Sequence, residues 1–201
     1  LGPLGDPTIS DSQYAREVIS GLVTSLDLSI ILREVKLLSA ELSPMTTLTE
    51  GDLDFSLITE GTTGFQSDLG GTVAAGRDNE VVVEQEVNTR QQIERAVCFA
   101  FDWAARHGRN RVTMVYGAKA QKHSQELWSR VFKEISDSFD NTSTSMLHTD
   151  AFIQRFVNTP DQLDVVVTDH MFGSVISSLA TAFIGGHGLA SVAHVNPDGK
   201  G

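Results

Sequence analysis

The sequence predicts an α/β fold in which helices flank an open sheet and a β arm projects from it. Strand-like apolar segments alternate with amphipathic helical segments along the 201 residues, which is the pattern of α/β proteins. Residues 163–168 form a continuous apolar run, typical of a strand covered on both faces. Residues 81–87 favour β structure and follow a Gly- and Ala-containing stretch, which predicts an arm near residues 72–87.

The first half of the chain contains five predicted elements. We expect a helix near residues 14–23, an extended buried segment at 28–38 and a strand at 53–58 that leads into a glycine turn, followed by the arm. Thr89 is placed to cap a helix that His107 and Gly108 end. This helix has the clearest apolar periodicity in the chain.

The second half continues the alternation. The expected elements are a strand at 112–116, a helix at 124–135, a polar stretch at 136–145, a helix at 151–157, a strand at 163–168 and a helix that carries Ser174 and Ser178. Because these two serines are four residues apart, their hydroxyls should lie on one face of that helix.

Composition excludes several classes of protein. A formal net charge of −11 argues against nonspecific binding to nucleic acid or to anionic membranes, since either needs a basic surface. No apolar run approaches the roughly 18 residues that span a bilayer. Cys98 is the only cysteine, so an internal disulfide is excluded, and we expect a core position for it and a cytoplasmic location for the protein.

Several motifs carry a resemblance to a known family. Asp164-Val-Val-Val-Thr-Asp-His-Met-Phe-Gly-Ser resembles the metal-binding stretch Asp-Val-Ile-Val-Thr-Glu-Asn-Leu-Phe-Gly-Asp of the isocitrate and isopropylmalate dehydrogenases. Thr89-Arg-Gln-Gln-Ile-Glu-Arg-Ala resembles the family's Thr-Arg helix, and Leu26-Asp-Leu-Ser-Ile-Ile-Leu-Arg resembles its strand ending in Leu-Arg-Pro. Each motif is weak alone, but their consistent order favours an isocitrate/isopropylmalate dehydrogenase-like fold.

The resemblance also implies how the chain is organised. Residues 1–201 would form a single region, namely the family's small, dimer-forming domain with adjoining parts of the large domain. The flanks of the nucleotide domain and the family's His-Gly-Ser/Thr-Ala-Pro cofactor loop have no counterpart in these residues. The family's arm helps to form a dimer, so the expected partner is a second copy of the chain or a related dehydrogenase subunit.

Substrate-binding residues are carried over by position. Arg33 matches the arginine of Leu-Arg-Pro and could bind a carboxylate, although it could instead pair with Glu34 or Glu60. Thr59-Glu-Gly-Thr-Thr-Gly aligns with the family's Arg-Glu-Asn-Thr-Glu-Gly, which places Glu60 and Thr62 at the substrate; Thr62 could equally belong only to the turn. Thr59 replaces a carboxylate-binding arginine, and Gln66 stands where the family has a tyrosine acid.

The catalytic assignments leave alternatives open. Without gaps, Gly117 falls at the family's lysine; a local shift instead places Lys119 there, or Lys119 is only solvated at a helix start. Tyr116 is a candidate substitute acid, and packing is its other interpretation. Asp150, in Thr149-Asp-Ala, matches the aspartate that the family contributes from a neighbouring subunit.

The metal site is the main departure from the family. Ser174 and Ser178 replace its two other metal-binding aspartates, and hard divalent cations prefer anionic oxygens over neutral hydroxyls. We therefore expect no metal site at Ser174 and Ser178 beside Asp150. The spacing of His170, His187 and His194 matches no zinc pattern, so ordinary structural roles are expected for them.

These observations lead to one main hypothesis about function. The chain is expected to be a diverged homologue that has lost metal-dependent oxidative decarboxylation and serves as a small-acid-binding, regulatory or scaffolding subunit, with no cofactor. One alternative is non-redox chemistry on a carboxylic acid. The other is a trimmed part of an active dehydrogenase, in which case NAD(P) and Mg²⁺ or Mn²⁺ would take part.

Overall fold

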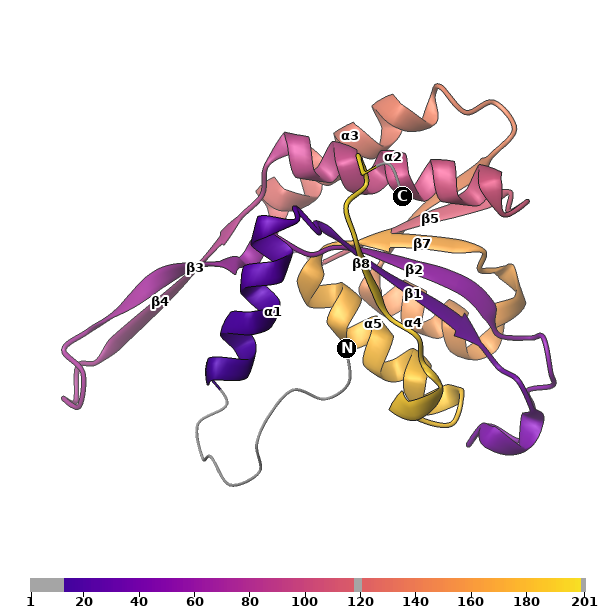
Figure 1. Cartoon of the computed structure of the whole chain (residues 1–201), viewed down its shortest axis with the longest axis horizontal. Helices are drawn as coiled ribbons and strands as arrows, with labels where there is room; N and C mark the ends of the chain where they lie inside the picture. The colour runs from indigo at the N-terminus through magenta and orange to yellow at the C-terminus, as the bar shows by residue number, and fades with distance from the viewer. Residues whose placement is uncertain (1–12, 118–120, 200–201) are drawn as a thin grey trace.

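A six-stranded sheet runs through the centre of the computed structural model, which describes residues 13–117 and 121–199 (Figure 1). The strands lie in the order β6 (Ser143–His148), β5 (Arg111–Tyr116), β7 (Val165–Thr168), β2 (Asp54–Glu60), β1 (Ile30–Lys36) and β8 (Ala193–Val195). The first four are mutually parallel, whereas β1 and β8 each pair antiparallel to their neighbour. The carboxyl ends of the parallel strands therefore meet at one edge of the sheet, where β1 begins.

Two helices cover each face of the sheet. Figure 1 shows α2 (Arg90–Arg106) and α3 (Lys122–Ser136) on one side and α4 (Thr149–Asn158) and α5 (His170–Phe183) on the other. A separate buried apolar cluster lies on each face of the sheet. One is between the sheet and α2 and α3, and the other is between the sheet and α4 and α5. The predicted α/β fold with flanking helices is confirmed.

Helix α2 shows why the local sequence folds as predicted. Thr89 Oγ1 accepts a hydrogen bond from the backbone nitrogen of Gln92, which caps the helix, and Gly108 adopts a positive φ of 64° just beyond it. The buried residues recur along one stripe of the helix: Ile93, Ala96, Val97, Ala100, Phe101 and Ala104. Cys98 lies off this stripe and is exposed, so its predicted core position is wrong.

Helix α5 sits close against the sheet. Asp169 caps it by accepting a hydrogen bond from the backbone nitrogen of Phe172 at 2.9 Å. Gly173 permits a tight approach to β2, because a Cβ at this position would lie 2.4 Å from Oγ1 of Thr59. Thr59 is itself buried, so it fills the space beneath α5.

The predicted arm is a two-stranded hairpin that projects from the body of the molecule (Figure 1). It consists of β3 (Gly64–Val73) and β4 (Val81–Val87), paired antiparallel with an irregularity between Gly64 and Leu69. Several large apolar side chains of the hairpin are exposed: Leu69, Val73, Val81, Val82 and Val83.

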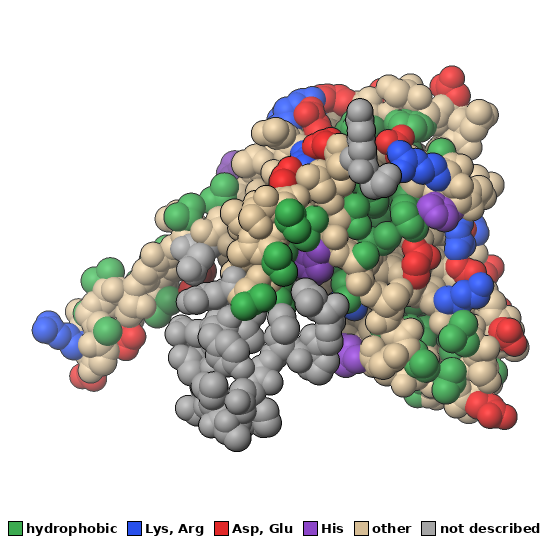
Figure 2. Space-filling model, in the orientation of Figure 1, with side chains coloured by type: hydrophobic (Ala, Val, Ile, Leu, Met, Phe, Trp, Pro, Cys, Tyr) green, Lys and Arg blue, Asp and Glu red, His purple; other side chains and the backbone are tan. Residues whose placement is uncertain are grey.

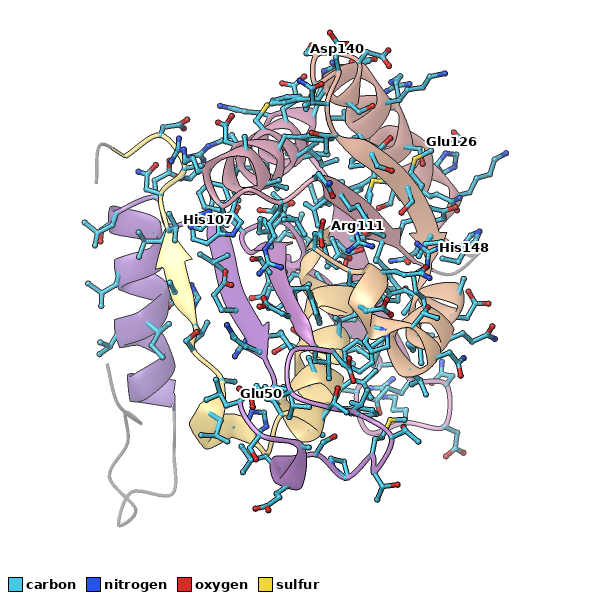
Figure 3. The ribbon with its side chains drawn as sticks, turned by 90° about the vertical axis from the view of Figure 1, so that its right-hand side faces the viewer. Glu50, His107, Arg111, Glu126, Asp140 and His148 are labelled. Atoms are coloured by element: carbon cyan, nitrogen blue, oxygen red, sulfur yellow. The ribbon has the colours of Figure 1, made fainter. Side chains whose placement is uncertain are left out.

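Helix α1 (Gln13–Ser25) stands beside the edge strand β8, as Figures 1 and 3 show. The described residues also form three short 3₁₀ turns, at Ala40–Leu42, Pro160–Gln162 and His187–Leu189. Within the part of the chain that the structure describes, no helix has the length and apolar character needed to cross a membrane.

An ion pair joins the first residue of β5, Arg111, to Asp164, the residue directly before β7. Arg111, labelled in Figure 3 at the start of β5, donates from Nη2 to Oδ1 of Asp164 at 2.9 Å and from Nε to Oδ2 at 3.1 Å. The backbone nitrogen of Arg111 donates to the same carboxylate. Burial opposes ionisation of Asp164, but Arg111 and these hydrogen bonds prevail and lower the pKa of the carboxyl.

Candidate functional site

The loop at the carboxyl end of β2 is organised by a buried carboxylate. Glu60 is 1% exposed. Its Oε1 accepts hydrogen bonds from the nitrogen and the hydroxyl of Thr62 at 2.8 and 2.7 Å, and its Oε2 accepts two from Thr63 at 3.0 and 2.5 Å. Both carboxylate oxygens therefore hold the turn, and Thr62 is placed beside the cavity described next.

A cavity of about 820 Å³ opens next to this loop, between α1, the start of β1, the start of the arm, α5 and β8. One wall is apolar and is formed by Ile19, Val23, Ile31 and Phe65. Figure 2 shows hydrophobic side chains gathered over α1 with histidine beside them. Of the described residues, none that lines the cavity is Asp, Glu, Lys or Arg.

Two histidines and a glutamine line the opposite side of the cavity. Nε2 of Gln66 lies 3.2 Å from Nδ1 of His170. Burial lowers the pKa of His170, nearby His194 lowers it further, and the charge of Glu60 opposes both effects. Burial also lowers the pKa of His194, as does the charge of Arg33. Both imidazoles therefore favour the neutral form at neutral pH.

Arg33 lies on the same strand as the lining residue Ile31 but does not itself line the cavity. It lies two residues beyond Ile31 on β1, so the two side chains share one face of the sheet, and Ile31 pairs with His194 of β8. Burial lowers the pKa of the Arg33 guanidinium. In the described part of the chain, no carboxylate lies within ion-pair distance of Arg33. The alternative pairing with Glu34 or Glu60 is therefore absent from this structure.

The positions that resemble the family's metal ligands carry two hydroxyls, of Ser174 and Ser178, and one carboxylate, of Asp150. Oγ of Ser174 donates to the backbone oxygen of His170 at 3.0 Å, and Oγ of Ser178 donates to that of Ser174 at 2.9 Å. Asp150 is exposed in the first turn of α4, and its Oδ1 accepts from the nitrogen of Ala151. Among the described residues, no three His, Cys, Asp or Glu side chains are grouped so that they could hold a metal ion.

The candidate catalytic residues do not gather at the cavity. Tyr116 packs against the apolar cluster below α2 and α3, with its ring centroid 4.4 Å from that of His148. Tyr116 and Asp150 do not line the cavity. A Cβ at Gly117 would lie 1.7 Å from Oε1 of Gln121, so this position is sterically closed as it stands. Lys119 falls outside the described residues, and its role stays a prediction.

The match to known proteins covers the whole chain. The family model of isocitrate/isopropylmalate dehydrogenase matches residues 1–201.

The chain belongs to the isocitrate/isopropylmalate dehydrogenase family.

Individual members are similar over nearly all of the chain. The 3-isopropylmalate dehydrogenase of Thermobifida fusca is 34% identical over 199 residues, which are 99% of this chain and 56% of that protein. The corresponding enzyme of Clavibacter michiganensis subsp. michiganensis is 36% identical over 97% of this chain and 55% of its own length. The chain thus spans a little over half the length of these family members.

Solved structures agree on the fold. The isocitrate dehydrogenase of Methylococcus capsulatus superposes with a TM-score of 0.83 and 26% identity, over 98% of this chain and 56% of that one. The TT0538 protein of Thermus thermophilus superposes with a TM-score of 0.78, over 98% of this chain and 38% of that one; at 21% identity it supports the fold alone.

Within this family fold, the sequence predicted only ordinary structural roles for the two histidines of the cavity. His170 directly follows the N-cap Asp169 at the carboxyl end of β7, a position where ligands commonly bind in α/β sheets. The position of His170 just after this strand was the one sequence feature that pointed to a role in ligand binding. His194 reaches the cavity only because β8 pairs with β1, which no spacing in the sequence predicts.

Proposed function

We propose that this member of the family binds a small carboxylic acid and does not carry out metal-dependent oxidative decarboxylation. The orientation of Ser174 and Ser178 carries the proposal. Each hydroxyl is neutral and donates its proton to a carbonyl of its own helix. Oxidising a 2-hydroxy acid and decarboxylating the product needs a divalent cation at the substrate oxygens. Two neutral hydroxyls are weak ligands for such a cation.

Acid binding is supported by Arg33. Arg33 is a half-buried cation with no carboxylate partner in the described residues, and it lies two residues beyond Ile31, which lines the cavity. An unpaired charge in partly buried surroundings is costly, so an anion there is favourable. In this proposal Glu60 acts through the loop that presents Thr62, whereas Arg33 would contact the ligand.

The arm supports a homodimer as the functional unit. Val73, Val81 and Val82 are 65%, 52% and 60% exposed on a ribbon that extends away from the body. A monomer rarely leaves such a group of apolar side chains exposed. In a symmetric dimer, the arm of each subunit would cover the apolar side chains of the other arm. A second copy of this chain is therefore the proposed partner.

The second candidate is an active dehydrogenase, favoured by the 34% identity to 3-isopropylmalate dehydrogenase of Thermobifida fusca. One assay on the complete protein separates the two candidates. Reduction of NAD and of NADP would be followed with Mg²⁺ or Mn²⁺ and isocitrate, 3-isopropylmalate, malate or tartrate. The proposal expects no metal-dependent reduction with any of them, and clear turnover would establish the second candidate instead.

A further inference from the structure

A second cavity, of about 490 Å³, lies between helix α2 and residues 195–199. Among the described residues, it shares no lining residue with the cavity beside α1. Two aromatic side chains line it, Phe99 and Trp103, which are one turn apart on α2. A molecule in this cavity therefore contacts two aromatic rings.

These rings belong to an ordered row along α2. The ring centroids of Phe99 and Trp103 are 5.9 Å apart, and His107, labelled in Figure 3, stacks on Trp103 with a centroid distance of 3.8 Å. Nε1 of Trp103 donates to Oγ of the buried Ser56 at 2.9 Å. The indole is thus oriented in advance, and a planar ligand can pack against the row in the offset or edge-on arrangements that aromatic rings favour.

The wall opposite α2 is tied to the helix by Arg95. Nε of Arg95 lies 2.9 Å from Oδ2 of Asp198. Its Nη1 and Nη2 donate to the carboxylate of Asp27 at 3.1 and 2.6 Å. The charge of Arg95 is therefore neutralised within the protein, and this guanidinium serves to build the cavity.

Two other charged side chains of the cavity have no such partner. Asp102 and Arg106 lie one turn apart on α2, on either side of Trp103 in the sequence. In the described part of the chain, neither forms an ion pair, whereas the lining acid Glu94 pairs with Arg90. The cavity therefore offers one acidic and one basic group beside its aromatic rings.

The acidic group acts on the interior of the cavity. Burial raises the pKa of the lining Cys98 thiol, and the charges of Asp102 and Glu94 raise it further. The same negative potential favours a cation at this place and disfavours a ligand that carries only negative charge. A carboxylate is favourable only as a partner of Arg106.

From this arrangement we infer that the cavity binds an aromatic amino acid in its zwitterionic form. The ring of the ligand packs against Phe99 and Trp103, its ammonium group pairs with Asp102, and its carboxylate pairs with Arg106. The inference goes beyond the proposed function, which concerns the cavity beside α1. It adds a second site that takes a different class of ligand.

Calorimetric titration of the protein with L-tryptophan tests the inference. We expect saturable binding with a Kd of about 1 mM or tighter. Three analogues that each lack one feature should bind at least about tenfold more weakly: tryptamine lacks the carboxylate, indole-3-propionate lacks the ammonium group and L-alanine lacks the ring. AMP, which joins an aromatic ring to negative charge alone, should be as weak. Equal or tighter binding of AMP would overturn the proposed ligand class.

Two charge variants with matched controls locate the polar end of the ligand. Asp102→Asn and Arg106→Gln should each weaken binding of L-tryptophan about tenfold. Asp140→Asn and Arg130→Gln remove exposed charges outside the cavity and should change binding less than about twofold. Equal weakening by a variant and its control would overturn the assignment of these two groups.

One ring variant locates the aromatic end. Phe99→Leu keeps an apolar side chain and removes the ring, and it should weaken binding about fivefold or more. Phe139→Leu makes the same change in a ring that packs against the same apolar cluster but does not line the cavity, and it should leave binding unchanged.

The indole N–H signals give a readout that a merely structural role of these residues would not move. The signal of Trp103 should shift on addition of L-tryptophan, whereas that of Trp128, which does not line the cavity, should stay in place. Absence of saturable binding, or binding that leaves the Trp103 signal unmoved, would overturn the inference.

Discussion

Oγ of Ser178 donates a hydrogen bond to the backbone oxygen of Ser174, 2.9 Å away, one turn earlier on α5. Oγ of Ser174 makes the equivalent bond to His170. These contacts turn both hydroxyls toward their own helix, although the side chains are exposed and share a face. The helix therefore presents neutral groups that are already hydrogen-bonded at the two positions where the resemblance places the family's metal-binding aspartates.

Restoring the carboxylates should restore affinity for metal. The double substitution Ser174→Asp and Ser178→Asp places two carboxylates on the exposed face of α5, and Mn²⁺ binding measured by calorimetry should tighten by about tenfold or more. The matched control is Ser174→Asn with Ser178→Asn, which has similar size and no charge. Equal affinity in the two double variants would contradict the electrostatic account.

Asp169 should make stability depend on pH. Burial raises the pKa of this carboxyl to about 6, and the charges of Glu86 and Glu60 add to the rise. Since the pKa in the folded state exceeds its unfolded value of 3.8, the protonated form stabilises the fold, and that contribution is lost as the pH rises through about 6. The loss is on the order of 2–3 kcal/mol.

Asp169→Asn tests this effect because asparagine also caps helices but cannot ionise. The free energy of unfolding in urea would be measured for both proteins from about pH 4 to about pH 8. The free energy of unfolding of the variant should increase relative to that of the parent protein as the pH rises across this range. A difference that stays constant with pH would show that the Asp169 carboxyl is not destabilised by its surroundings.

The close approach of α5 to β2 predicts a second stability effect. Gly173→Ala places a methyl group 2.4 Å from Oγ1 of the buried Thr59, and such overpacking should lower the free energy of unfolding by about 1–3 kcal/mol. Adding Thr59→Ala removes the contacted atoms, so the double variant should lose less than the sum of the two single losses. Gly188→Ala, which meets open space, is the control. Additive losses would mean that α5 can move away from the sheet.

The arm should control association. Val82 is 60% exposed, and Val82→Lys places a charge where the proposed dimer buries an apolar surface. Sedimentation velocity should show a dimer for the parent chain and a shift toward monomer for the variant. Val192→Lys, exposed on the body of the molecule, should leave the dimer intact. A parent chain that sediments as a monomer would refute the proposed partner.

Local sequence signals predicted several elements because their determinants lie within the element. The Thr89 cap and the apolar stripe of α2 are examples, as are the buried run of β7 and the turn before β4. Two strands, β6 and β8, were not predicted, and β3 begins at Gly64 rather than near residue 72. β6 and β3 contain many polar residues or glycines, and β8 has only three residues, so none shows a clear alternation.

The candidate site was only partly predictable, because part of it depends on pairing between segments that are far apart in the sequence. Arg33 and Thr62 were placed by the resemblance of one short segment each to a family motif. The cavity instead depends on antiparallel pairing of β8 with β1, which brings His194 to Ile31. The role of Glu60 in holding the turn was also missed, because a carboxylate beside two threonines does not reveal which groups it will accept from. That residues 1–201 form a single region stays a prediction.

The central claim is that the serine-for-aspartate positions leave no firmly held divalent cation. Calorimetric titration of the parent chain with Mn²⁺, at a protein concentration that permits the dimer, tests it most directly. The account predicts no saturable binding tighter than about millimolar. Binding in the micromolar range that Asp150→Asn abolishes would contradict it.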